Sequence, residues 1–98
     1  MMRREIDLVM LERVMSHLNM ELLRRFDQHG TGAMASPHEI RGVLDEEVEE
    51  LHEAIRENDG VGTYNELFDV AVAALVGCMS LYEEVQIGKG KASGLVPL

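Results

Sequence analysis

The residues best suited to chemistry are acidic side chains in two short runs, residues 46–50 and 66–69. Each run includes a pair of carboxylates spaced three residues apart: Glu47 with Glu50, and Glu66 with Asp69. Residues with this spacing share one face of an α-helix. Two facing helices would therefore bring these carboxylates together as ligands for a hard divalent cation, Mg²⁺ or Mn²⁺. Such a cation commonly supports phosphate chemistry.

Glu47 lies at an unexpected place on the segment that is predicted to form the second helix. At about 100° per residue, the apolar residues of this segment form one arc, and Glu47 falls inside it between Val43 and Leu51. Burying an unpaired carboxylate costs several kcal/mol, so we expect a compensating group nearby. The neighbouring acids outside the arc are expected to be solvated: Asp45, Glu49 and Glu53.

The segment predicted to form the third helix is apolar nearly all round. Its remaining strip holds small and acidic residues, which are Glu66, Asp69, Ala73, Gly77 and Ser80. Acids near a helix start suit the helix dipole, and this explains Glu66 and partly Asp69, but not Glu47 on the other helix. Small residues on the same strip allow a second helix to approach closely. Taken together, the two segments favour a metal site over a solvated acidic surface.

Three helices are predicted to position these residues, over about 4–29, 37–58 and 63–86. Apolar residues repeat every three or four positions along the first. Ser36, Pro37 and Glu39 form a capping box at the start of the second, and Thr63 with Glu66 predicts another at the start of the third. The pattern predicts an all-α fold with the second and third helices as an antiparallel hairpin.

The domain organisation predicted from length and composition is one all-α domain over residues 1–87 and a flexible Gly-rich tail over residues 88–98. A chain of 98 residues buries a limited core. We therefore expect a homodimer or homotetramer, in which a second copy completes a four-helix-type bundle. The first helix and the exposed parts of the third are predicted to lie at the interface.

Charge and cysteine content narrow the function classes. The net charge of −9 disfavours a protein that binds the backbone of nucleic acids. A single cysteine, Cys78, allows no intramolecular disulfide, which favours a cytoplasmic location. No uncharged apolar run reaches membrane-spanning length, so we expect no membrane contact.

The acidic signature also resembles a known family. Glu-Glu-x-x-Glu followed by Glu-x-x-Asp is similar to the signature of the all-α nucleoside triphosphate pyrophosphohydrolases, the MazG-like superfamily. The resemblance spans roughly residues 29–81. Family members commonly have a fourth helix, where this sequence predicts its Gly-rich tail.

The resemblance implies hydrolysis of a nucleoside triphosphate to a monophosphate and pyrophosphate with Mg²⁺. It implies metal ligands at Glu47, Glu50, Glu66 and Asp69, with Glu46 as an auxiliary carboxylate. By its chemistry, Glu46 or Glu47 is suited to orient or deprotonate the attacking water. Candidates for substrate binding are His29, Arg41 and Lys89, and further candidates for clamping phosphates are Arg24, Arg25 and Lys91.

Two other interpretations stay open on the sequence. The segments that begin at Asp27 and Asp59 resemble calcium-binding EF-hand loops, although the spacing to Glu39 and Glu66 does not match that motif. The second alternative is a helical protein with a structural or partner-binding role, whose acids are solvated. Failure to bind any divalent ion would support it.

Overall fold

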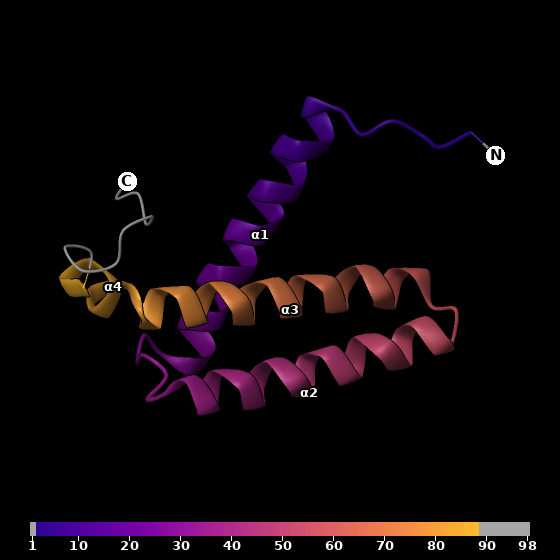
Figure 1. Ribbon diagram of the computed structural model, residues 1–98. Coiled ribbons are helices and arrows are strands. Elements are labelled where there is room, and N and C mark those ends of the chain that lie inside the picture. The colour runs from indigo at the N-terminus through magenta and orange to yellow at the C-terminus, as the bar shows by residue number, and fades with distance from the viewer. Residues whose placement is uncertain (1, 89–98) are drawn as a thin grey trace. The chain divides into compact units, whose positions relative to one another are not determined.

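The computed structural model describes residues 2–88, and the regular structure in this range is entirely helical, which confirms the all-α prediction. The helices are α1 (Leu8–His29), α2 (Pro37–Arg56), α3 (Gly60–Ser80) and α4 (Tyr82–Gly88) (Figure 1). The chain divides into two compact units, Met1–Gly32 and Ala33–Leu98, and each is described by itself. The single domain over residues 1–87 stays a prediction. Residues 89–98 of the predicted tail lie outside the described residues.

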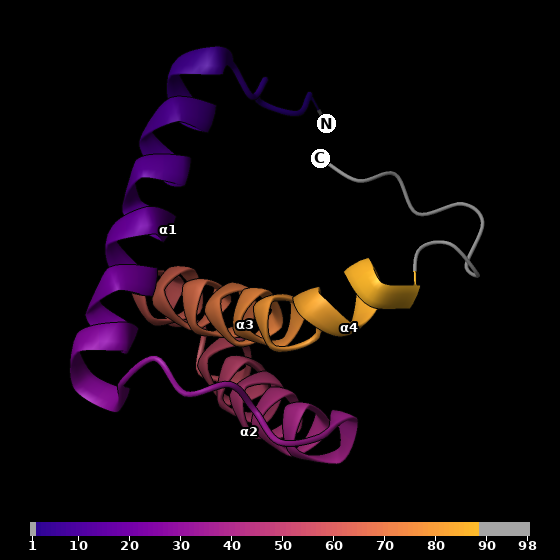
Figure 2. The same ribbon diagram turned by 90° about the vertical axis from the view of Figure 1, so that its left-hand side faces the viewer.

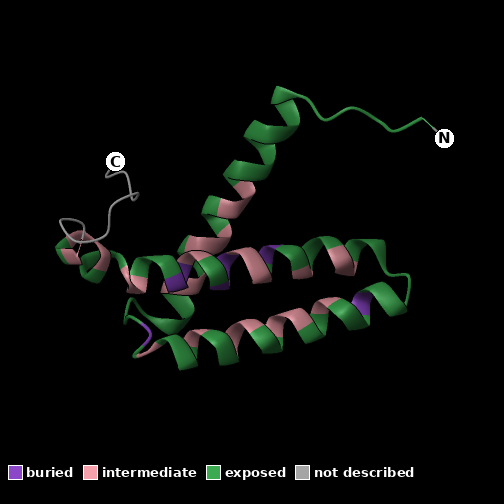
Figure 3. Cartoon of the chain, in the orientation of Figure 1, coloured by how far each residue is buried: buried purple, intermediate pink, exposed green. Residues whose placement is uncertain are grey.

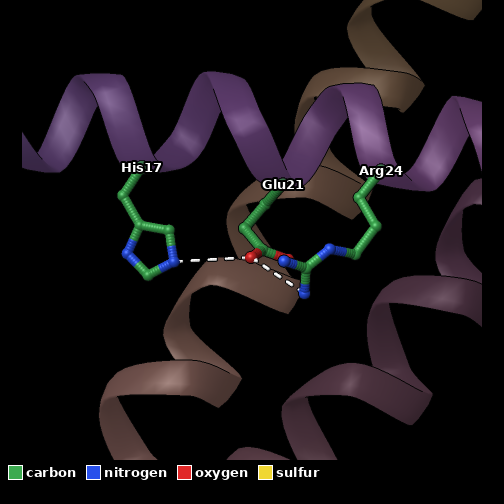
Figure 4. A network of polar contacts seen from close by, with 3 residues as sticks. All are labelled: His17, Glu21 and Arg24. Atoms are coloured by element: carbon green, nitrogen blue, oxygen red, sulfur yellow. Dashed lines mark ion pairs between the residues drawn. The ribbon is translucent and has the colours of Figure 1, made fainter.

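The first unit is built on α1, which begins at Leu8 instead of Arg4 because Asp7 caps it. The Asp7 side chain accepts a hydrogen bond of 2.9 Å from the Met10 N–H, as expected of an N-cap. Gly30, with a φ of 78°, ends the helix, and its N–H donates to the Phe26 carbonyl. The main ion-pair network of α1 joins Glu21 to His17 at 3.4 Å and to Arg24 at 3.3 Å (Figure 4).

The second unit is a helical hairpin in which α2 and α3 run side by side in opposite directions (Figure 1, Figure 2). Ser36 caps α2 as predicted, because its hydroxyl accepts from the Glu39 N–H. The Glu39 carboxylate accepts from the Ala35 N–H at 2.8 Å, one residue before the N–H that a capping box uses. The start of α2 is therefore fixed by the residues that the sequence pattern indicated.

The turn between α2 and α3 differs from the prediction. Asn58 takes a left-handed conformation, with a φ of 56°, which Asn tolerates better than most residues. Asp59 then caps α3 and accepts from the Gly62 N–H at 2.8 Å. The predicted Thr63 cap is wrong, because the Thr63 hydroxyl instead donates to the Asp59 carbonyl at 2.7 Å inside the first turn of the helix.

The hairpin core lies mainly along α3 (Figure 3). Its buried apolar residues are Phe68, Val72, Ala73 and Val76, with Ala54 from α2 and Met34 from the segment before α2. The two helices approach closely at Gly77, where an added Cβ would lie 3.0 Å from Cγ2 of Ile40. The small strip of α3 thus serves close packing, as the sequence predicted.

The third helix ends earlier than predicted, and a short fourth helix follows it. The Ser80 hydroxyl donates to the Val76 carbonyl and accepts from the Met34 N–H. The break falls at Leu81, and α4 continues from Tyr82 to Gly88, where the sequence had suggested one unbroken helix and then a tail. Bonds of this kind from Ser to the preceding turn are known to bend helices.

By length and composition alone, α3 is apolar enough to cross a membrane. No uncharged run within α3 is long enough to span a membrane, because Glu66 and Asp69 interrupt the helix. A core helix of a soluble protein meets the same criterion. In the described structure, α3 packs against the acidic helix α2.

Candidate metal centre

Four carboxylates converge between α2 and α3. Glu47 and Glu50 come from α2, and Glu66 and Asp69 come from α3. Each side chain offers one oxygen, and these atoms all lie within 4.8 Å of one another. Carboxylate oxygens in such a group are the ligands that Mg²⁺ and Mn²⁺ prefer.

The hairpin register explains this convergence. The contact between Ile40 and Gly77 sets the start of α2 against the end of α3. Moving along both helices toward the turn brings the residues around Glu47 and Glu50 opposite those around Asp69 and Glu66. The three-residue spacing then points both members of each pair toward the facing helix.

The two more buried carboxylates of the group lack some of their hydrogen-bond partners. Glu47 and Glu66 are half-buried, whereas Glu50 and Asp69 are exposed. In both Glu47 and Glu66, Oε2 is buried and has no hydrogen-bond partner. A buried acceptor without a partner costs about 1–3 kcal/mol, and more when it is charged. The site therefore holds acceptor atoms that a cation would satisfy.

Electrostatics in the cluster favour protonation. Burial, followed by repulsion from Glu50, Asp69, Glu66 and Glu46, raises the pKa of Glu47 to about 7. The pKa of Glu66 is also raised, first by burial and then by Asp69 and Glu50. The proximity of Glu66 to the carboxyl groups of Asp69 and Glu50 also favours its protonated, hydrogen-bonding form and so adds to the rise in its pKa. Without a cation, these carboxylates resist being ionised together.

The other predicted site residues lie in different settings. Glu46 is exposed beside Glu47 and adds to the repulsion that raises its pKa. Arg41 is exposed and pairs with Asp45 at 3.5 Å. His29 is the last residue of α1 and belongs to the first unit, together with Arg24 and Arg25. Lys89 and Lys91 lie outside the described residues.

The structure adds packing roles to the strip that carries Glu66 and Asp69. Gly77 allows the approach of Ile40, and Ser80 holds the backbone of the segment before α2 through the Met34 N–H. The sequence placed both residues on the acidic strip without showing that they fix the hairpin. Long-range partners such as Ile40 and Met34 leave no local signal in the chain.

The segments that resemble EF-hand loops have other roles. Asp59 caps α3, the Glu39 carboxylate accepts from the Ala35 N–H at the start of α2, and Asp27 lies within the last turns of α1. Among residues 2–88, the only group of at least three metal-ligating side chains that converges is the one formed by Glu47, Glu50, Glu66 and Asp69.

Comparison with known proteins identifies no relative: no family model, curated protein or solved structure matches this chain. The resemblance to the MazG-like superfamily therefore stays a prediction. It rests on the acidic residues and their spacing.

Proposed function

We propose that this protein is a Mg²⁺-dependent nucleoside triphosphate pyrophosphohydrolase. The single observation that carries the proposal is the convergence of four carboxylate oxygens within 4.8 Å between α2 and α3. The resemblance to the MazG-like superfamily supplies the substrate class and the cleavage between the α and β phosphates. A cytoplasmic role in removing surplus or non-standard triphosphates fits this activity.

The residues of the cluster suit a divalent cation. Glu47, Glu50, Glu66 and Asp69 would hold it, and the buried Oε2 atoms of Glu47 and Glu66 have no other partner. When bound, Mg²⁺ or Mn²⁺ neutralises phosphate charge and lowers the pKa of a coordinated water. The chain itself contributes the ligand oxygens and their fixed positions on two packed helices.

We assign the remaining roles to residues of α2 outside the cluster. Glu46, exposed and adjacent to Glu47, is suited to orient or deprotonate the attacking water. Arg41 is suited to contact a phosphate. It forms an ion pair with Asp45, but the two side chains are 82% and 70% exposed, so this pair holds Arg41 only weakly. Exposed ion pairs of this kind contribute about 0–1 kcal/mol and are readily exchanged.

The test is a panel of nucleoside triphosphates with Mg²⁺, in which pyrophosphate and orthophosphate are measured separately. We expect pyrophosphate release by the wild-type protein and its loss in Glu50→Ala and Asp69→Ala. Glu49→Ala is the matched control, because Glu49 is an exposed acid of α2 that pairs with Arg56 instead of the cluster. Release of orthophosphate alone would indicate a different phosphohydrolase.

A second function is favoured by the distribution of basic residues. Within residues 33–88, the Lys and Arg residues are Arg41 and Arg56, and both form exposed ion pairs on α2. These two arginines provide little positive charge for binding a triphosphate. A helical protein that binds a metal or a partner without hydrolysis is therefore the alternative. Metal binding without turnover of any nucleotide would select it.

We also propose that a second copy completes the helical bundle. The hairpin of α2 and α3 leaves large apolar side chains of α3 exposed, including Leu67 and Met79. A hairpin of two helices buries little apolar surface by itself. Self-association would cover part of this surface.

A further inference from the structure

Asp59 and Gly60 form a pair that is prone to spontaneous modification of the backbone. This is the only place in the chain where Asp or Asn precedes Gly. The nitrogen of the following residue can attack the Asp side chain, and Gly leaves that approach open because it lacks Cβ. Both residues are exposed, and they join the turn after α2 to the start of α3. The pair is therefore a modification site unless the fold prevents the reaction.

The reaction is an isomerisation in which water is released and then taken up again. The Gly60 nitrogen forms a bond to Cγ of Asp59, its proton leaves with the hydroxyl of the carboxyl group as water, and a succinimide ring closes. Water then adds to the Asp59 backbone carbonyl carbon, and the bond from that carbon to the Gly60 nitrogen breaks. The product is isoaspartate, which has the same mass but makes the backbone longer by one methylene.

The conformation of Asp59 in the structure does not allow this ring to close. Ring closure requires Cβ and the Gly60 nitrogen to lie on the same side of the Cα–C bond, which for an L-residue corresponds to a ψ of about −120°. Asp59 has a ψ of 97°, which places the Gly60 nitrogen nearly opposite Cβ. The reaction therefore requires a large rotation of the peptide unit between the two residues.

Hydrogen bonds on both sides of Asp59 oppose that rotation. Its N–H donates to the Ala54 carbonyl at 3.0 Å. Its carbonyl accepts from the Thr63 N–H at 2.8 Å and from the Thr63 hydroxyl at 2.7 Å, and the rotation would carry this oxygen away from both donors. The side chain is held as well, because its Oδ1 accepts from the Gly62 N–H at 2.8 Å. These bonds must break before the ring can close.

We propose that the capped turn between α2 and α3 protects the Asp59–Gly60 pair, which isomerises only when the first turn of α3 opens locally. The rate in the folded protein is then the rate of the unfolded chain multiplied by the fraction of molecules with an open turn. Isomerisation lengthens the backbone at the cap of α3, so each reaction weakens the start of this helix. The inference is independent of the proposed metal binding and hydrolysis.

Peptide mapping after incubation in heavy-oxygen water measures the reaction, because each succinimide that is hydrolysed takes up one heavy oxygen atom. The wild-type protein should react more slowly in neutral buffer than in concentrated guanidinium chloride, by a factor of about 10 or more. Gly60→Ala identifies the pair, because its Cβ hinders the attack and should slow the reaction in denaturant. Open space around Gly60 lets this variant fold.

Gly62→Ala tests the contacts that hold Asp59. A Cβ on residue 62 would overlap the Asp59 carboxyl group, so the variant displaces this side chain from its capping position. We expect the reaction to be about fivefold faster in neutral buffer, which is the factor that loss of one cap introduces into an opening equilibrium. Thr63→Val removes the hydroxyl bond and should act in the same direction. Gly42→Ala is the matched control in open space on α2 and should leave the rate unchanged.

Gly77→Ala separates opening of the turn from unfolding of the whole hairpin. It changes the packing near the opposite end of α3 and should leave isomerisation at Asp59 unchanged. Equal wild-type rates in buffer and in denaturant would overturn the proposal, because the fold would then give no protection. Unchanged rates in both Gly62→Ala and Thr63→Val would show that these contacts do not hold the pair. A faster reaction in Gly77→Ala would assign it to global unfolding.

Discussion

At the scale of single residues, Glu47 is the strongest link between sequence and chemistry. Its position inside the apolar arc of α2 forces a carboxylate toward α3, where three further acids meet it. Burial and these neighbours raise its pKa from 4.5 to about 7. Near pH 7 and without a bound cation, Glu47 therefore keeps a proton much more readily than an ordinary carboxyl group.

This shift predicts a pH-dependent stability. Between pH 4.5 and about 7 the folded protein holds a proton on Glu47 that the unfolded chain has lost. The free energy of unfolding should therefore fall as pH rises through this window. At 1.36 kcal/mol per pKa unit, reduced for partial solvation, Glu47 accounts for about 1–3 kcal/mol. Urea denaturation without metal, from about pH 4.5 to about pH 8, measures this decrease.

The variant Glu47→Gln isolates this contribution. It removes the titrating group, so the metal-free variant should be more stable than the wild type above pH 7 and should show a weaker pH dependence. Glu49→Gln, which changes an exposed acid on the same helix, should follow the wild-type pH curve. Parallel curves for Glu47→Gln and the wild type would show that Glu47 carries no unfavourable charge.

At the scale of the elements, the capping residues fix where each helix begins, and therefore where its carboxylates lie. Asp59→Ala should lower the free energy of unfolding by about 1 kcal/mol, because it removes the hydrogen bond that Gly62 donates to the α3 cap. Asp59→Asn keeps an acceptor and should lose much less. Chemical denaturation compares them, and a loss confined to Thr63→Val would instead support Thr63 as the cap.

The close approach of α2 and α3 predicts opposite effects for two glycines. Gly77→Ala places a Cβ 3.0 Å from Cγ2 of Ile40, and overpacking of this kind typically costs about 1–3 kcal/mol. We expect this cost to exceed the gain in helix propensity, which is up to about 1 kcal/mol. Gly42 lies in α2 with open space around it, so Gly42→Ala should gain up to about 1 kcal/mol from helix propensity. Thermal denaturation measures both, and stabilisation by Gly77→Ala would contradict the packing.

Much of this arrangement could be predicted from the sequence, because its signals are local. Helical periodicity, the Ser36 cap and the three-residue spacing of the acids all act within a few turns of one helix. The start of α3 was misplaced because Asp59 and Thr63 are both good caps and only the folded turn chooses between them. The break at Leu81 accompanies the contact of Ser80 with the Met34 backbone, a partner far away in sequence.

At the scale of the whole molecule, acidic residues outnumber basic ones, so a bound cation should stabilise the folded state. Millimolar Mg²⁺ should raise the midpoint of thermal unfolding, and the increase should be larger at about pH 8 than at about pH 5, where protons compete for Glu47 and Glu66. A ligand present at 100 times its dissociation constant adds about 2.7 kcal/mol. An equal increase in a variant that combines Glu66→Gln with Asp69→Asn would assign the effect to ionic strength.

The central claim is that the four carboxylates of α2 and α3 form one divalent-cation site. Titration with Mn²⁺, with free Mn²⁺ followed by electron paramagnetic resonance, tests this claim most directly. The wild-type protein should show saturable binding that Mg²⁺ displaces, and Glu49→Gln should bind in the same way. The combined variant Glu66→Gln with Asp69→Asn should lose this binding while its helical content stays unchanged. Equal Mn²⁺ binding by the wild type and the combined variant, or no binding by either, would contradict the account.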